Sequence, residues 1–294
     1  MSPVIQIWDL DIVDILEPVY CLGEKTKKKE NNQKIKSKRH KDAVISLSWN
    51  KHVRNILASG SADSSIIMWD LQEGTALKKF NFHTGKVQAL QWHPFESHFL
   101  LSGCTDGIIS VHDCQTENGE NKTWKVEGEI ERVLWNLFES LKFFCSTDLG
   151  FVYSIDMRNT EIEHSTKAHE EAVTGLDMSQ ERNMLLTAGM DGTLKMWNVE
   201  DGFIFLKAFK LKVGSIYTAK ISPDSGFTTA IGGNAPSHNL KVMDIDEKLK
   251  DEKVKKKFKV KNAMPTTSRS PPEKKARFDK TSSKKSKHNV KNYK

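Results

Sequence analysis

A six-residue pattern of apolar and polar positions recurs along the chain at a constant interval. The first, fourth and sixth residues of each copy are apolar, with Ala219 the smallest of them, and successive copies end 43 residues apart. A short apolar-rich run of this kind, bounded by turn residues, predicts a β-strand. The predicted strands are Val44–Trp49, Val87–Trp92, Ile130–Trp135, Val173–Met178 and Ile216–Ile221.

Each copy is followed by two further apolar runs that are joined by a short turn. Asp-Gly at 106–107 and 191–192, and Gly- or Asp-containing turns at 61–63 and 148–150, are typical of hairpins. A repeat of roughly 40–45 residues built from short strands predicts an all-β fold, a β-propeller. One unit cannot bury its own apolar faces, so we expect each four-stranded sheet to pack on its neighbours around an axis.

The two ends of this array are predicted to be incomplete. Residues 4–10 read as a strand ending in Trp8-Asp9, residues 17–22 can form the next strand, and the fifth unit has no evident outer strand. We therefore expect about five full repeats plus an orphan N-terminal strand, which falls short of a seven-bladed ring. Only a closed ring removes exposed sheet edges. We therefore expect a shortened form of a longer protein, in which the blade array has an uncovered sheet at each end.

Charge divides the chain into an acidic body and two basic segments. Residues 248–294 carry a net charge of +14 although the whole chain carries +7, which leaves −7 on the remainder. Within that remainder, residues 25–41 carry +8. We predict a propeller over 1–246 with a disordered Lys-rich loop at 25–39, and a largely disordered basic tail over 247–294, because neither basic segment has enough apolar residues for a core.

The Trp-Asp dipeptides at 8–9 and 69–70, with Trp-Asn at 197–198, resemble the signature of the WD-repeat family. The resemblance covers about residues 4–246. It implies a hydrogen-bonded tetrad in a repeat: a His before the first strand, a Ser or Thr on the second, an Asp in the next turn and a Trp on the third. The matching residues are His40, Ser59, Asp63 and Trp69; His169, Thr187, Asp191 and Trp197; and His83, Ser102 and Asp106, with His112 in the Trp place.

Two repeats depart further from the tetrad pattern. The third keeps only Asp148, and the fifth keeps no clear member, so we expect its sheet to be looser. Tryptophan also recurs at two strand positions, in Trp49, Trp92 and Trp135 and in Trp8, Trp69 and Trp197. With the Lys-rich tail, this resembles a nuclear and nucleolar branch of the family. That branch carries an acidic N-terminal segment, which this chain lacks.

The resemblance to that branch implies a function in ribosome biogenesis and rRNA processing. It implies a non-enzymatic scaffold in the nucleus and nucleolus whose propeller binds protein partners in pre-ribosomal complexes. The acidic body suits basic partner proteins.

Motifs for catalysis and for cofactors are absent from the sequence. A hydrolase needs one His, Ser and Asp triad rather than one in several units, and there is no G-x-S-x-G elbow, phosphate loop or H-E-x-x-H pair. The four Cys form no CxxC pair, which argues for free thiols and against a metal site. We expect no catalytic residue, metal, cofactor or small-molecule substrate, and no membrane partner.

The basic tail carries two short clusters that favour nuclear import or contact with nucleic acid. These are Lys274, Lys275 and Arg277, and Lys284, Lys285 and Lys287. Lys-rich segments bind RNA by neutralising phosphates without reading its sequence. Ser270, which precedes Pro271, is a candidate phosphosite whose added negative charge would weaken that contact.

Two other functions remain open at the level of sequence. An acidic body with a basic tail also fits a chromatin- or histone-binding protein that regulates transcription, with the tail on DNA. Asp156-Met157-Arg158 partly resembles the WDxR box of ubiquitin-ligase substrate receptors, although Ile155 stands in the Trp place.

Overall fold

The computed structural model describes residues 2–11, 17–24, 39–116, 121–225, 227–236 and 239–245. These residues contain 21 β-strands and no helix, as the repeat pattern predicted. The strands are β1 (Ile5–Ile7), β2 (Tyr20–Leu22), β3 (Val44–Trp49), β4 (Ile56–Ser61), β5 (Ile66–Asp70), β6 (Thr75–Phe80), β7 (Val87–Trp92), β8 (Phe99–Cys104), β9 (Ile108–Asp113), β10 (Lys122–Lys125), β11 (Ile130–Trp135), β12 (Lys142–Thr147), β13 (Phe151–Asp156), β14 (Ile162–Lys167), β15 (Val173–Met178), β16 (Met184–Gly189), β17 (Thr193–Asn198), β18 (Ile204–Lys210), β19 (Ile216–Ile221), β20 (Thr228–Gly233) and β21 (Leu240–Asp244).

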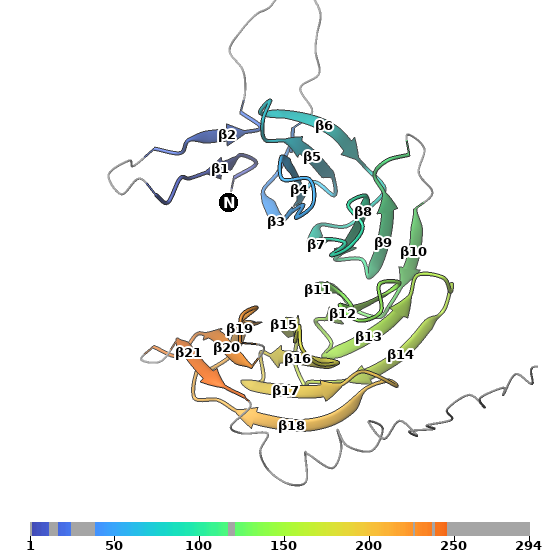
Figure 1. The fold of residues 1–294 in the computed structure, drawn as a ribbon, viewed down its shortest axis with the longest axis vertical. Helices are drawn as coiled ribbons and strands as arrows, with labels where there is room; N and C mark the ends of the chain where they lie inside the picture. The colour runs from blue at the N-terminus through green and yellow to red at the C-terminus, as the bar shows by residue number, and fades with distance from the viewer. Residues whose placement is uncertain are drawn as a thin grey trace, which may run out of the picture.

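The strands form five successive sheets, named here blades 1 to 5, and one hairpin. Blades 1 to 4 each contain four antiparallel strands in chain order, β3–β6, β7–β10, β11–β14 and β15–β18. Blade 5 contains β19–β21, and β1 pairs with β2. The blades lie around a common axis with the first strand of each innermost, and the array is open between the β1–β2 hairpin and blade 5 (Figure 1).

The innermost strand of every blade has the same irregularity. Its register against the second strand shifts between its first and third residues, as at Val44/Ser46 in blade 1 and Ile216/Thr218 in blade 5. The same shift occurs in blades 2, 3 and 4. A bulge adds one residue to one strand and increases the local twist. The five units thus share one backbone plan, and the 43-residue interval is a repeat of structure as well as of sequence.

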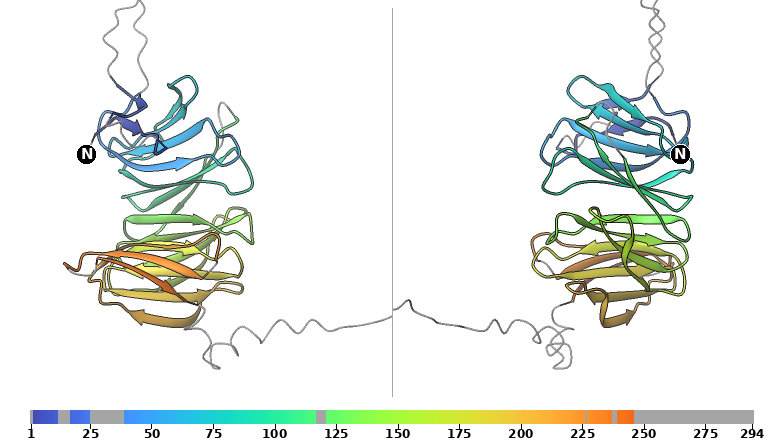
Figure 2. Two further views of the ribbon diagram at one scale, coloured as in Figure 1. Left: turned by 60° about the vertical axis from the view of Figure 1, so that its left-hand side comes forward. Right: turned by 90° about the vertical axis from the view of Figure 1, so that its right-hand side faces the viewer.

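The core lies between adjacent blades rather than inside one sheet. The side views in Figure 2 show the sheets stacked in chain order. Between blades 2 and 3, the Trp135 ring packs edge-on against Phe143 and His93, at centroid distances of 5.6 and 4.4 Å. Burying one such apolar side chain contributes about 2 kcal/mol. Each sheet therefore depends on its neighbour for stability.

The N-terminal hairpin differs in extent from the predicted strand. β1 covers residues 5–7 rather than 4–10, so Trp8 lies beyond it and is exposed. The hairpin packs against blade 1, where Ile5 and Leu22 form a cluster with Leu57, Ile67 and Trp69. The predicted loop at 25–39, apart from its last residue, and the predicted tail over 247–294 lie outside the residues that the structure describes.

Candidate protein-interaction surface

The tetrad residues of blade 1 form a continuous chain of hydrogen bonds. The Trp69 indole N–H donates to Ser59 Oγ at 2.7 Å, and Ser59 Oγ lies 2.7 Å from His40 Nε2. His40 Nδ1 lies 3.3 Å from Asp63 Oδ1. Because a carboxylate only accepts, His40 Nδ1 carries the proton and Nε2 accepts the Ser59 hydroxyl. The imidazole is thereby held in one tautomer, and burial lowers its pKa despite the opposing effect of Asp63.

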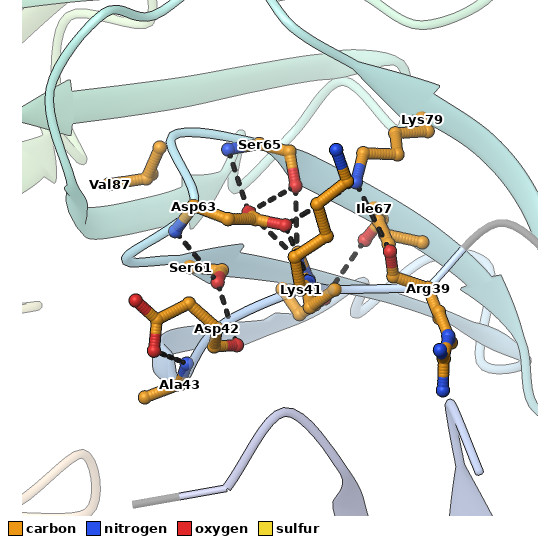
Figure 3. A network of polar contacts seen from close by, with 12 residues as sticks. Arg39, Lys41, Asp42, Ala43, Ser61, Asp63, Ser65, Ile67, Lys79 and Val87 are labelled. Carbon is orange, nitrogen blue, oxygen red and sulfur yellow. Dashed lines mark hydrogen bonds and ion pairs between the residues drawn. The ribbon is translucent and has the colours of Figure 1, made fainter. Parts of the chain in front are cut away.

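Asp63 joins three segments of blade 1 (Figure 3). Its carboxylate accepts the backbone N–H of Lys41 at 2.7 Å and of Ser65 at 3.1 Å, and it lies 3.4 Å from Lys79 Nζ. Lys79 Nζ also donates to the Arg39 carbonyl at 3.1 Å. Burial by itself raises the pKa of Asp63, but hydrogen bonds from Ser65 and Lys41 outweigh it and hold the pKa below its usual range. The loop before β3 is fixed against the turn after β4.

Blade 4 repeats this arrangement with a threonine in the hydroxyl position. Thr187 Oγ1 accepts the Trp197 indole N–H at 3.0 Å and lies 2.8 Å from His169 Nε2. His169 Nδ1 lies 3.1 Å from Asp191 Oδ2, which also accepts the Glu170 N–H at 3.3 Å. The structure thus brings together both complete sets of four residues.

Blade 2 keeps only part of the chain. His83 Nε2 lies 2.7 Å from Ser102 Oγ, but Asp106 accepts the Thr84 hydroxyl and the Cys104 thiol instead of bonding to His83. His83 Nδ1 is buried and has no hydrogen-bond partner among the described residues. Burial lowers the pKa of His83 to about 4. The structure joins His83 to Ser102, but it does not join Asp106 to either of them, unlike the arrangement that the resemblance implies.

His112 replaces the tetrad tryptophan in blade 2 and makes different contacts. Its Nδ1 pairs with Asn121 Oδ1, and its ring lies 4.3 Å from Phe80 and 5.4 Å from Phe82 between centroids. Its buried Nε2 finds no partner in the described part of the chain. A buried polar atom without a partner carries a desolvation cost, so blade 2 is the weakest of the three His-containing networks.

Blade 3 has exchanged the whole network for apolar contacts. Val126, Cys145 and Ile155 occupy the places of His, Ser and Trp, and all three are buried. Removing every partner together leaves no buried polar atom unpaired. Asp148 keeps its second role, because its Oδ1 accepts the Glu129 N–H at 2.7 Å.

Blade 5 contains a residue of this kind that the sequence reasoning missed. Asn234 Oδ1 accepts the Ser215 N–H at 2.9 Å, and Asp148 makes the equivalent contact with the Glu129 N–H, because each N–H belongs to the residue directly before the inner strand. The signal was present, because Asn234 lies 43 residues after Asp191. One edge of the array, named here the turn edge, is therefore built from loops that a side-chain oxygen holds in all five blades, with Thr105 Oγ1 accepting the Lys86 N–H in blade 2.

The opposite edge, named here the cap edge, has its own repeated contact. The residue after each of the first three inner strands accepts two backbone N–H groups of the following loop. Asn50 Oδ1 and Asn136 Oδ1 do so at 2.9–3.0 and 2.9–3.2 Å, and His93 Nδ1 does so at 2.8 and 3.1 Å. The capped loops present Phe95 and Phe138 to solvent. Exposed aromatic side chains on a fixed backbone are typical of protein-binding surfaces.

A cavity of about 290 Å³ lies on the axis side of the inner strands. Its wall is polar backbone and side chains from all five blades, including Gln88, Arg132 and Lys220. Arg132 Nε donates to the Thr174 carbonyl at 2.9 Å, which ties blade 3 to blade 4. The wall groups hold neighbouring blades together, and they form no triad of nucleophile, base and orienting acid of the kind that a hydrolase needs.

The described residues offer neither a metal-binding cluster nor a membrane-spanning helix. They contain no cluster of three or more His, Cys, Asp or Glu side chains placed to hold a metal ion. None of their secondary-structure elements is a helix long and apolar enough to span a bilayer. All four cysteines are free, and burial raises the pKa of Cys104 and Cys114 to about 12.

Comparison with known proteins agrees with the geometry. The family model "WD domain, G-beta repeat" matches residues 32–70, 74–113 and 160–198. The chain is 36% identical over 244 residues to the Drosophila melanogaster periodic tryptophan protein 1 homolog. The chain belongs to the WD-repeat family. The match with the Drosophila protein covers 80% of this chain and 52% of that relative.

Other WD-repeat relatives show the same partial coverage. The chain is 37% identical over 250 residues to an uncharacterized WD repeat-containing protein of Schizosaccharomyces pombe, covering 83% of this chain and 48% of that one. It is 32% identical over 287 residues to Saccharomyces cerevisiae periodic tryptophan protein 1, covering 88% and 49%. The chain therefore spans about half the length of the curated relatives it matches.

A solved structure supports the WD-repeat fold alone. A chain in the crystal structure of the mitotic checkpoint complex superposes with a TM-score of 0.61 at 22% identity, covering 68% of this chain and 60% of that chain.

The WDxR-like residues lie at the end of β13, where the side chain of Arg158 is largely exposed and forms an ion pair with Asp156 at 2.5 Å. The candidate tail residues from Ser270 to Lys287 lie outside the described residues.

Proposed function

We propose that this chain is a non-enzymatic scaffold that acts in ribosome biogenesis and rRNA processing in the nucleus and nucleolus. The observation that carries the proposal is the similarity to the Drosophila and yeast periodic tryptophan proteins over four fifths or more of the chain. The described surface supports a binding role, because it offers capped loops with exposed Phe95 and Phe138 and a polar axial wall.

The charge distribution supports two kinds of partner. The acidic body suits basic proteins, and the basic tail suits the phosphate groups of RNA. Outside residues 25–41 and 248–294 the chain carries a net charge of −15, which attracts basic assembly proteins. The tail clusters at 274–277 and 284–287 direct nuclear import and make nonspecific contact with RNA, which weakens steeply with salt. Phosphorylation of Ser270 reduces that contact.

A pull-down of the tagged chain from nuclear extract tests the function. Pre-ribosomal proteins and pre-rRNA should copurify, and RNase should release them while DNase leaves them bound. Loss of the complexes only after DNase would show the chromatin-bound alternative instead. Copurification of a cullin adaptor would support the ubiquitin-ligase alternative.

A second experiment tests the role of the tail. Replacing Lys274, Lys275, Arg277, Lys284, Lys285 and Lys287 with Ala should abolish nuclear accumulation of a fluorescent fusion. A matched variant with six Lys→Ala changes in the basic segment at 25–38 loses the same charge and should still enter the nucleus. Equal nuclear accumulation of both variants would contradict the assignment.

A further inference from the structure

The cap-edge contacts include a donor that links each blade to the next. Asn50 Nδ2 donates to the Ser97 carbonyl of blade 2 at 2.8 Å, and His93 Nε2 donates to the Ser140 carbonyl of blade 3 at 2.7 Å. Asn136 stands in the same place in blade 3, and its Oδ1 makes the same loop cap. Its Nδ2 makes no such link to blade 4 among the described residues, and Asn136 lines an accessible cavity instead.

A cavity of about 320 Å³ lies beside Asn136, between blade 3 and the loop that joins β17 to β18 in blade 4. Asn136 lines it together with Phe144 of blade 3 and Phe203, which follows the third strand of blade 4. The two rings lie 6.0 Å apart between centroids. The volume is at the lower end for ligand pockets, so the space is large enough for one long side chain of a partner.

Acidic side chains dominate the rest of the cavity wall. Lys142 Nζ lies 3.0 Å from Glu139 and 2.9 Å from Glu163, so one cation is already held between two carboxylates. Glu200 and Asp201 line the blade 4 side. The wall therefore keeps a net negative charge, and Glu200 has no ion-pair partner within the described residues.

We propose that this cavity binds an arginine side chain, with the adjoining peptide carbonyl, from a basic segment of a partner protein. The guanidinium group suits carboxylates and stacks on aromatic rings, and Phe203 is the ring available to it because Phe144 is almost fully buried. Asn136 Nδ2 donates to the peptide carbonyl, as Asn50 and His93 do to carbonyls of their neighbouring blades. The proposed arginine site rests on the proposed scaffold function and gives that function a binding site for a partner protein.

Fluorescence anisotropy with a labelled nine-residue peptide tests the site on the full chain. The peptide contains two arginines separated by glycine and serine residues. A control peptide of the same length has citrulline in place of both arginines. The arginine peptide should bind about tenfold more tightly. Equal binding of both peptides would overturn the proposal.

Two variants then place the peptide in this cavity. Glu200→Lys should weaken binding of the arginine peptide about tenfold, whereas Glu73→Lys, the same charge change on the corresponding loop of blade 1, should leave it unchanged. Asn136→Ser keeps a capping oxygen, as Ser179 does in blade 4, and should weaken binding about threefold. Equal affinities for the Glu200 and Glu73 variants would overturn the proposal.

The peptide titration is independent of the pull-down that tests ribosome biogenesis. If pre-ribosomal complexes copurify but the arginine peptide does not bind, only the assigned site is contradicted. Peptide binding without pre-ribosomal complexes contradicts the proposed function and leaves the cavity as a peptide site.

Discussion

Trp49 and Trp92 occupy the same position in consecutive repeats, yet only one of them is buried between blades. Trp92 is 5% exposed, and its indole N–H donates to the Ser48 carbonyl of blade 1 at 3.0 Å. Trp135 makes the equivalent bond to the Gln91 carbonyl at 3.2 Å. Trp49 is 55% exposed and donates to Arg54 in its own loop, because the described residues place no inner strand before β3.

The two tryptophans should therefore differ in their effect on stability. Trp92→Ala opens a cavity between blades and should lower the free energy of unfolding by about 3–5 kcal/mol. Trp49→Ala removes an exposed ring and should lower it by less than about 1 kcal/mol. Urea unfolding followed by circular dichroism measures both, and equal losses would show that Trp49 is covered in solution.

Ser59 should matter more than its size suggests. Ser59→Ala leaves His40 Nε2 and the Trp69 indole N–H without their shared partner, at a cost of about 2–4 kcal/mol. Cys145→Ala at the equivalent place in blade 3 removes only a buried thiol and should cost about 1 kcal/mol. Thermal unfolding of the two variants compares a polar network with its apolar replacement, and a larger loss at Cys145 would contradict this account.

The cap at His93 should depend on an acceptor rather than on an imidazole. His93→Asn restores the chemistry of Asn50 and Asn136 and should change the free energy of unfolding by less than about 0.5 kcal/mol. His93→Ala leaves the Phe95 and Glu96 N–H groups uncapped and should cost about 1–2 kcal/mol. If the Asn variant is as unstable as the Ala variant, the ring packing of His93 on Trp135 is the main contribution.

Acid should destabilise the propeller before its carboxylates titrate. Burial lowers the pKa of His83 to about 4, and it also lowers the pKa of His40 and His169. Because the folded pKa lies below the unfolded value of about 6.5, this stability is complete above pH 6.5 and is lost as pH falls towards 4. His83 alone should account for about 3 kcal/mol of that loss.

Urea unfolding at several pH values measures this dependence. The slope between pH 6.5 and 4 should be smaller in a His83→Gln variant, which cannot titrate. An unchanged slope would mean that His83 is protonated in the folded state. Asp63, whose pKa is depressed, adds a further loss only at lower pH.

Most of the fold and part of the candidate surface were predictable from the sequence. The 43-residue interval located all five inner strands, and the resemblance to the WD-repeat family pointed to the two sets of four residues that the structure joins. Asn234 was missed because it is not an Asp, although the interval pointed to it. The cap contacts of Asn50, His93 and Asn136 were missed because they share no residue type, only an acceptor atom at one position.

By itself the sequence determined the strand rhythm, the hairpin turns and the chemical identity of each repeated position, because these depend on neighbours within a few residues. Only the tertiary structure decided that Trp92 is buried and Trp49 is exposed, and that the Asn136 amide borders a cavity. Burial and pairing depend on the sheet that packs alongside. That sheet lies about 43 residues away in the chain and is not encoded in the local pattern.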